Sequence, residues 1–400
     1  MMPTTLKIET LTPIWTGDAD GACTEIKETG IIGSMRWWYE AIVRGLGGYA
    51  CDPTSDGNAG ILKRCELDDK KFKESLESGT SVQDALDEQI CPACRLFGCT
   101  GWRRRFRVEI ESVDVVELNF VNKLSDINAG WWIETTLNAK PKAFYSFNTA
   151  KLKLISEDKE IENKIRVLLK LIEDIGSFGA KAQNGFGVSE FVFDRELARP
   201  TVGDEVIQYS KNNPDKSNPS EFRTLNDFYK FMVRIKSMDK LLKRFGERQK
   251  AQEYMLTGFT LKYFLRKRIK EFGDEELSTL VSNFDEIEAA IKNKTPIKKY
   301  NKISKIVART LFGSDLEDED SKWASLIEVS HIYKKEADYQ FRVVCFLPKT
   351  VTYDDINIKF VTSSVISVIQ KLLEGEFGDS VEIGETWSGT EIFDDLFKEY

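Results

Sequence analysis

The feature that most constrains the fold is the order in which strand-like and helix-like segments follow one another in the first half of the chain. Strand patterns occur in TLKIETLTPIW, RVEIESVDVVEL, WWIETTLNAK, KAFYSFNT and VSEFVFD. Helices are predicted at about residues 35–46 and in IENKIRVLLKLIEDI, where apolar residues recur every three or four positions. With the three strand patterns between the two helices counted as two strands, the predicted order is strand, helix, strand, strand, helix, strand.

This βαββαβ order predicts an α+β, ferredoxin-like domain of the kind shared with RNA-recognition domains. A chain of 400 residues is too long for one ordinary core, so we expect two domains. The first spans residues 1–199 and carries a cysteine-rich insertion at about 49–101. Residues 200–222 contain three prolines and many polar side chains, and are predicted to link it to a helix-rich α+β domain at 223–400.

The charges narrow the choice of partner. The formal net charge is −8, which by itself argues against nucleic acid. The charges are segregated, however, with acids in DLEDED (315–320) and at the C-terminus, and bases in CRLFGCTGWRRRFRV, KLLKRFGERQK and LKYFLRKRIK. A local basic surface is therefore compatible with the acidic average.

The sequence disfavours two further classes of protein. It has no run of about 18 apolar residues and no apolar signal segment at its N-terminus, so we expect a cytoplasmic protein with no membrane partner. It has one histidine, His331. Because general acid–base catalysis most often uses histidine, a hydrolytic role is disfavoured.

The stretch IIGSMRWWYEAIVRGLGG (31–48) places two tryptophans between arginines. Neighbouring residues on a helix point about 100° apart, so Trp38 is predicted to enter the core and Trp37 to stay partly exposed. Ser34 is the predicted N-cap, and helix N-termini attract anions. Five residues are therefore predicted to contact RNA: Gly33, Ser34, Arg36, Trp37 and Arg44. The alternative is that Trp37 packs under the cysteine-rich insertion and the arginines form ion pairs.

A second candidate is the glycine loop GSFGAKAQNGFG, residues 176–187. Glycines let the backbone approach a ligand closely, and a lysine can reach a phosphate. The loop follows a helix and precedes a strand, the reverse of nucleotide-cofactor loops, and it lacks GK[ST]. We expect four residues here to contact an RNA backbone: Gly176, Gly179, Lys181 and Gly185. An ordinary connection between a helix and a strand is the alternative.

The third candidate is CPACRLFGCTGWRRRFRV, residues 91–108. Cys91 and Cys94 have the spacing of a metal knuckle, and Cys51 and Cys65 could complete a structural zinc site, with Cys99 as a substitute. Buried thiols, or a disulfide in a hyperthermophile, are the alternatives. Alternation along a strand would put Arg103 and Arg105 on one side, as a basic row facing RNA or as a solvated face.

Four stretches together resemble the RAMP superfamily and, within it, the first-numbered subunits of type III-B CRISPR (Cmr) effector complexes: LTPIWTGD, GSMRWWYEAIVRGLGG, CPACRLFGCTGWRRRFRV and GSFGAKAQNGFG. The resemblance implies tandem ferredoxin-like domains, the second with helical insertions. It implies a non-catalytic subunit that binds crRNA near its 3′ end, target single-stranded RNA, or both, beside other Cmr subunits in antiviral defence. The second half of the chain resembles the family more weakly, through RTLFG and WASLIEVS.

Two alternatives to an RNA-binding subunit remain. One is an adaptor that only joins other subunits, with the acidic C-terminal surface as its working part. The other is a metal-dependent ribonuclease that uses the carboxylates of Asp18 and Asp20, which lie in one loop.

Overall fold

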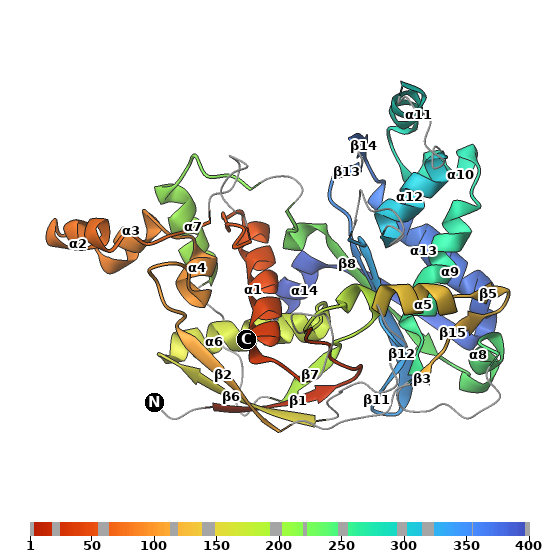
Figure 1. The fold of residues 1–400 in the computed structure, drawn as a ribbon, viewed down its shortest axis with the longest axis horizontal. Coiled ribbons are helices and arrows are strands. Elements are labelled where there is room, and N and C mark those ends of the chain that lie inside the picture. The colour runs from red at the N-terminus through yellow and green to blue at the C-terminus, as the bar shows by residue number, and fades with distance from the viewer. Residues whose placement is uncertain are drawn as a thin grey trace.

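The computed structural model describes residues 4–17, 25–54, 64–112, 119–137, 149–192, 202–218, 222–246, 255–293, 302–313, 324–353 and 355–396. Two antiparallel sheets, one from each half of the chain, lie side by side with helices packed on them (Figure 1). The expected α+β class is confirmed. No helix in the described part is long and apolar enough to cross a membrane.

The first sheet has the strand order β2-β6-β1-β7, and every neighbouring pair is antiparallel. Its strands are β1 (Thr4–Thr10), β2 (Phe106–Ser112), β6 (Thr149–Ser156) and β7 (Ser189–Val192). Two helices pack against it, α1 (Glu28–Gly45) and α6 (Lys159–Asp174). Along the chain these six elements have the predicted order of strand, helix, strand, strand, helix, strand, but β6 lies in TAKLKLIS, where no strand was predicted beyond Thr149.

Helix α6 shows how the sequence produces these elements. The Asp158 side chain accepts a hydrogen bond from the Ile161 N–H and so caps the first turn. Ile161, Ile165 and Leu168 recur at helical spacing and are buried. The predicted helix is therefore confirmed within two residues of its predicted ends.

The second sheet has the order β10-β12-β8-β15, again antiparallel throughout. Its strands are β8 (Phe228–Ile235), β10 (Ile327–Val329), β12 (Asp338–Phe346) and β15 (Val381–Ser388), and β11 (Tyr333–Lys335) forms a hairpin with β12. Five helices lie between β8 and β10: α8 (Met238–Arg244), α9 (Gly258–Lys270), α10 (Asp274–Leu280), α11 (Phe284–Asn293) and α12 (Ile303–Phe312). Helix α13 (Thr362–Phe377) lies between β12 and β15, and α14 (Gly389–Asp395) follows β15.

Shorter elements complete the described part. The cysteine-rich insertion contains α2 (Asp69–Glu77), α3 (Val82–Asp87) and α4 (Pro92–Phe97), and it projects to one side of the molecule (Figure 1). The others are β3 (Asn119–Phe120), β4 (Lys123–Leu124), β5 (Ile127–Asn128), β9 (Met255–Leu256), β13 (Val351–Tyr353) and β14 (Ile356–Ile358).

Three local predictions need correction. Helix α1 begins at Glu28, so Ser34 lies inside it and is not its N-cap. The segment WWIETTL forms a helix, α5 (Gly130–Leu137), because its Trp132 and Ile133 are both buried, which an alternating strand would not allow. The predicted linker contains a further helix, α7 (Val202–Asn212). The expected strand KAFYSFNT lies outside the described residues except at Thr149.

Candidate functional site

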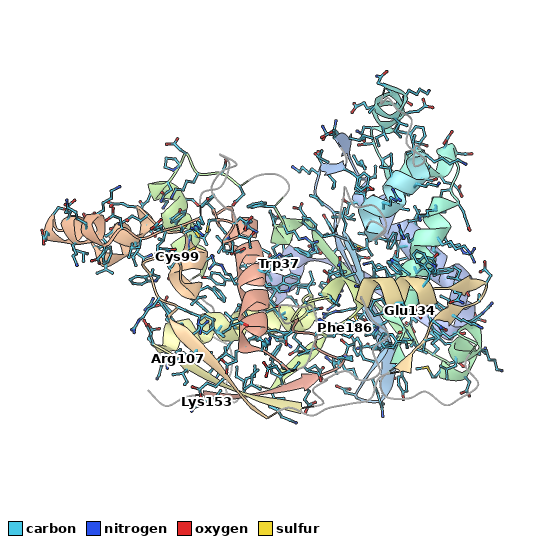
Figure 2. The ribbon with its side chains drawn as sticks, in the orientation of Figure 1. Trp37, Cys99, Arg107, Glu134, Lys153 and Phe186 are labelled. Atoms are coloured by element: carbon cyan, nitrogen blue, oxygen red, sulfur yellow. The ribbon has the colours of Figure 1, made fainter. Side chains whose placement is uncertain are left out.

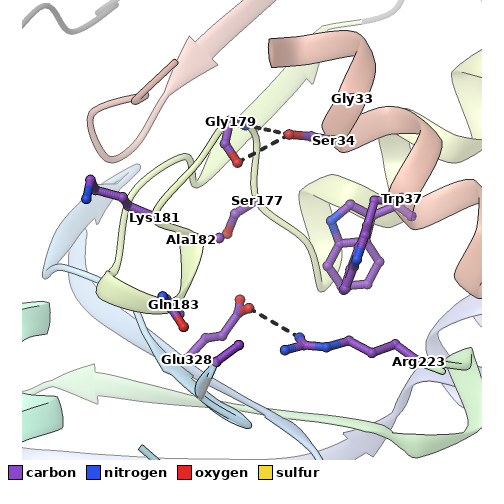
Figure 3. Close-up of a pocket in the computed structure, with 12 residues that line it drawn as sticks. Gly33, Ser34, Trp37, Ser177, Gly179, Lys181, Ala182, Gln183, Arg223 and Glu328 are labelled. Carbon is purple, nitrogen blue, oxygen red and sulfur yellow. Dashed lines mark hydrogen bonds and ion pairs between the residues drawn. The ribbon is translucent and has the colours of Figure 1, made fainter. Parts of the chain in front are cut away.

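Helix α1 and the glycine loop meet at a cavity of about 530 Å³ (Figure 3). The two segments are far apart in the sequence, and folding brings them together with residues from the second half of the chain. The lining side chains and backbone come from α1 (Gly33, Ser34, Trp37, Trp38), from the loop (Ser177, Gly179, Lys181, Ala182, Gln183) and from the second half (Arg223, Ala324, Glu328).

The junction between α1 and the loop is fixed by hydrogen bonds. Ser34 Oγ accepts a hydrogen bond from the Gly179 N–H at 2.8 Å and lies 3.1 Å from the Gly30 carbonyl oxygen. Gly179 has a φ of +76°, and a Cβ there would lie 2.3 Å from the Trp15 carbonyl oxygen. Only glycine fits at this position, because any side chain would displace the Trp15 backbone.

The two tryptophans differ in burial as predicted. Trp38 is 3% exposed, and its ring lies 4.9 Å from that of Phe228. Trp37 is only partly buried, borders the cavity, and meets Trp38 edge to face at 4.9 Å. Trp38 is therefore part of the core, and Trp37 offers an aromatic surface to the cavity.

Arg223 and Glu328 form the far wall of the cavity (Figure 3). The Arg223 guanidinium lies 5.2 Å from the centre of the Trp37 ring, and its Nη1 is 3.8 Å from Glu328 Oε1. Burial lowers the pKa of Arg223, and the carboxylate of Glu328 partly offsets this shift. This wall therefore carries one cation and one anion side by side.

Lys181 lines the cavity on the side of the glycine loop. Its φ is +62°, in the left-handed region, and its Nζ lies 5.3 Å from the centre of the Trp15 ring. Burial lowers the pKa of Lys181. A left-handed conformation is uncommon for a lysine, so the tight turn of the loop determines where this side chain leaves the backbone. In Figure 3 its amino group points away from Trp37 and Arg223.

Five of the residues predicted from the sequence line this cavity: Gly33, Ser34, Trp37, Gly179 and Lys181. The other two loop glycines that were predicted to contact RNA, Gly176 and Gly185, are packed against neighbouring residues. A Cβ on Gly176 would lie 2.7 Å from Trp38 Cε2, and one on Gly185 would lie 2.7 Å from the backbone nitrogen of His331. The loop is thus packed tightly between the two halves of the chain.

The four predicted arginines lie elsewhere. Arg103 and Arg105 form ion pairs with Glu157 beside the first sheet, at 3.2 and 3.0 Å. Arg36 and Arg44 both contact Glu40 on α1, on the face that meets the cysteine-rich insertion. The ion-paired alternative considered from the sequence describes their placement.

Sequence reasoning missed Arg223, Glu328 and Gln183, which complete the cavity. Arg223 comes from a segment with no motif, whereas Glu328 lies in WASLIEVS (323–330), a stretch that resembles the same family but for which no site residue was predicted. Only folding brings the two side chains to α1. Gln183 lies inside the glycine loop, and its side-chain oxygen accepts a hydrogen bond from the Ser325 N–H at 3.0 Å. Its place in the loop was the one signal that could have found it.

A second group of side chains is the cysteine cluster, which we define as Cys51, Cys65, Cys91 and Cys94. Their sulfur atoms all lie within 4.8 Å of one another, and all four side chains are buried. The Sγ atoms of Cys51 and Cys94 are 3.4 Å apart, and those of Cys51 and Cys91 are 3.9 Å apart. Four sulfurs at about 2.3 Å from a tetrahedral zinc ion would be about 3.8 Å apart. The grouping predicted from spacing is confirmed, and its dimensions fit a metal ion.

Comparison with known proteins adds the following. Residues 7–190 match the model of the RAMP superfamily. No curated protein matches the sequence. The apo crystal structure of Cmr1 from Pyrococcus furiosus is similar over 97% of this chain and 100% of that chain, with 14% identity and a TM-score of 0.45. A chain in the cryo-EM structure of the type III-B Cmr-beta complex bound to cognate target RNA is similar over 93% of this chain and 98% of its own, with 12% identity and a TM-score of 0.43.

Proposed function

We propose that this chain, whose residues 7–190 match the model of the RAMP superfamily, is a non-catalytic RNA-binding subunit of a type III-B CRISPR (Cmr) effector complex. In this role it binds single-stranded RNA, as crRNA near its 3′ end, as target RNA, or as both, in antiviral defence. The observation that carries the proposal is the cavity at which α1 and the glycine loop meet, because it combines an aromatic surface, cations and closely approachable backbone.

The chemistry of the cavity suits one nucleotide of a single strand. Its volume of about 530 Å³ falls within the usual range for small-ligand pockets. Trp37 offers a surface on which a base can stack, and stacking tolerates any base. The carboxylate of Glu328 repels phosphate, so the phosphate lies toward Lys181 and the base toward Trp37 and Arg223.

We interpret both sheets as ferredoxin-like, which makes the chain a tandem arrangement. With the hairpin strand β11 left out, the first strand of each sheet in sequence is central and pairs with the third and fourth, while the second strand is at an edge beside the third. The second domain then differs from the first by the helices α8–α12 inserted before β10. RNA-recognition domains use the same order of elements.

The chemistry of the one histidine supports a non-catalytic role. His331 is buried, its Nδ1 accepts a hydrogen bond from the Gly258 N–H, and burial lowers its pKa to about 3. Such a side chain is neutral at physiological pH and sealed from substrate. Asp18 and Asp20, the alternative ribonuclease residues, lie outside the described residues. Incubation of labelled RNA with the protein and Mg²⁺ or Mn²⁺ should leave it intact, and cleavage that Asp18→Ala abolishes would contradict this.

We also propose that the cysteine cluster holds one structural zinc ion. A Cys₄ donor set with no room left for water is typical of structural zinc sites. The purified protein should contain about one equivalent of zinc, and chelation should lower its melting temperature. Elemental analysis that finds no transition metal would contradict the proposal.

The RNA proposal is tested by fluorescence anisotropy with a labelled single-stranded RNA at several salt concentrations. Lys181→Gln should weaken binding and reduce the salt slope by about one, as expected for a lost phosphate contact. The control is Lys153→Gln, a lysine on β6 that pairs with Glu109 at 3.4 Å and lies away from Trp37 (Figure 2). No affinity of the wild-type chain for RNA would favour the adaptor.

A further inference from the structure

The Arg36 side chain connects helix α1 to the cysteine cluster. Its Nη2 lies 3.2 Å from Cys94 Sγ and 4.0 Å from Cys51 Sγ. Its Nη1 donates to the Gly98 carbonyl oxygen at 2.9 Å, and its Nε donates to Glu40 Oε1 at 2.8 Å. Three nitrogens of one guanidinium therefore hold the helix, the cluster and the turn after α4 together.

The charge of a loaded cluster explains why a cation is built in here. A zinc ion with four thiolates carries two net negative charges, and burying charge is costly unless an opposite charge lies nearby. Arg36 is 16% exposed at its side chain and donates directly toward the sulfurs. Arg44 adds a second cation on the same helix face, at 3.4 Å from Glu40.

The same helix turn reaches the cavity on its other side. Trp37, the residue after Arg36, borders the cavity, and Ser34 on the preceding turn bonds to the glycine loop. The rotation of α1 that points Arg36 at the sulfurs also points Trp37 at the cavity. A change at one side of this turn is therefore transmitted to the other through a single rigid helix.

From this geometry we infer that Arg36 is an outer-sphere partner of the metal centre, and that through it the metal holds Trp37 in place for RNA. Arg36 is thus a positioning residue and not an RNA contact. The inference about the metal stands on the cysteine cluster alone, and its extension to RNA rests on the proposed function.

The first experiment measures zinc transfer from the full-length protein to a chromophoric chelator. A second cavity of about 430 Å³, lined by Cys65, Gln89 and Lys216, borders the cluster and gives the chelator a route. Arg36→Met keeps the length of the side chain but removes its donors. It should lose zinc about 10–100-fold more readily than the wild type, the usual cost of removing an outer-sphere partner.

The matched control for zinc transfer is Arg166→Met. Arg166 is 4% exposed at its side chain and pairs with Glu162 at 2.8 Å, one helical turn away on α6, so it resembles Arg36 in being a largely buried arginine that pairs with a glutamate of its own helix. It should transfer zinc at the wild-type rate. Equal rates for Arg36→Met and the wild type, or equal acceleration by both variants, would overturn the role of Arg36.

The second experiment measures RNA affinity in excess zinc, so that Arg36→Met stays loaded and folded, with circular dichroism as the check on folding. Its RNA affinity should fall toward that of Trp37→Ala, while its salt slope stays at the wild-type value. An unchanged affinity would overturn the coupling to RNA. A salt slope reduced by about one would show instead that Arg36 contacts phosphate.

These two experiments separate the inference from the proposed function. If the wild-type chain binds no RNA, the proposed function and the coupling both fail, whereas the zinc-transfer result still decides whether Arg36 serves the metal. If the wild-type chain binds RNA and Arg36→Met binds equally well, only the coupling fails.

Discussion

Two adjacent tryptophans have different surroundings, and this difference can be measured. Trp38→Ala should destabilise the fold by about 3–5 kcal/mol, because it empties a buried site against Phe228. Trp37→Ala should instead cost about 1–3 kcal/mol of RNA binding, the range for one stacked base. Thermal melting and RNA anisotropy on both variants make the comparison. If both variants melt alike and bind alike, Trp37 serves only packing.

His331 gives the chain a stability that depends on pH. Burial lowers its pKa to about 3, below the usual 6.5. Between pH 3 and pH 6.5 the unfolded chain therefore binds a proton at this side chain, whereas the folded chain does not. The contribution of His331 to the free energy of unfolding is fully present above about pH 6.5, and it falls by about 1.4 kcal/mol for each pH unit below that value. His331→Asn, which keeps an acceptor for the Gly258 N–H, should lack this component. Denaturant unfolding of both proteins at several pH values measures the difference.

For single residues, the sequence predicts burial and grouping well but predicts interaction partners poorly. The burial of Trp38 and the grouping of four cysteines follow from helical geometry and from spacing. The partners of Arg36 do not, because a guanidinium can bind a phosphate, a carboxylate or a thiolate. In the fold, Arg36 binds the carboxylate of Glu40 and, because the insertion folds against α1, lies 3.2 Å from the sulfur of Cys94.

Helix α1 contains a glycine that costs stability and leaves space. Gly33 lies inside the helix, and nothing lies within 4 Å of the position of a Cβ. Gly33→Met should raise stability by up to about 1 kcal/mol, since methionine is the better helix former, yet fill the cavity and weaken RNA binding. Thermal melting and anisotropy test both parts.

Gly375→Met is the matched control for that variant. Gly375 also lies inside a helix, α13, and also has nothing within 4 Å of its Cβ position, but it does not line the cavity. It should be stabilised to a similar extent and bind RNA as the wild type does. Equal RNA affinity for both variants would mean that the space beside Gly33 is not used.

A helix or strand was predicted correctly where the interactions that form it lie within the segment itself. The pattern of α6 and its Asp158 cap lie within the helix, and its prediction is confirmed. The early start of α1 depends on distant contacts, because Ile31 is buried and Ser34 bonds to Gly179. Gly30 and Gly33 made this turn look like a loop in the sequence, and tertiary contacts outweigh that preference.

The two halves of the molecule are joined by a buried cation. Arg342 on β12 donates to the Glu173 carbonyl oxygen and to Ser177 Oγ, both at 3.0 Å, so it bridges the second sheet to the first domain. Arg342→Met should cost about 1.5–3 kcal/mol, the range for hydrogen bonds from a charged donor. The wild type should melt in one calorimetric transition and this variant in two.

Arg234→Met provides the control for this bridge. Arg234 lies on the neighbouring strand β8, is well exposed, and faces Asp338 at 3.7 Å. Exposed pairs of this kind contribute little, so the variant should melt like the wild type. A single unshifted transition for Arg342→Met would show that the bridge does not couple the halves.

The strand order of the first sheet has a consequence for synthesis. Strand β1 is made first, but it lies between β6 and β7, and β7 ends at Val192. The four cysteines are complete once Cys94 has been made. At about 5–20 residues per second, roughly 5–20 seconds separate the two events on the ribosome. The nascent chain can therefore form its cysteine cluster before β6 and β7, the two strands that flank β1, have been synthesised.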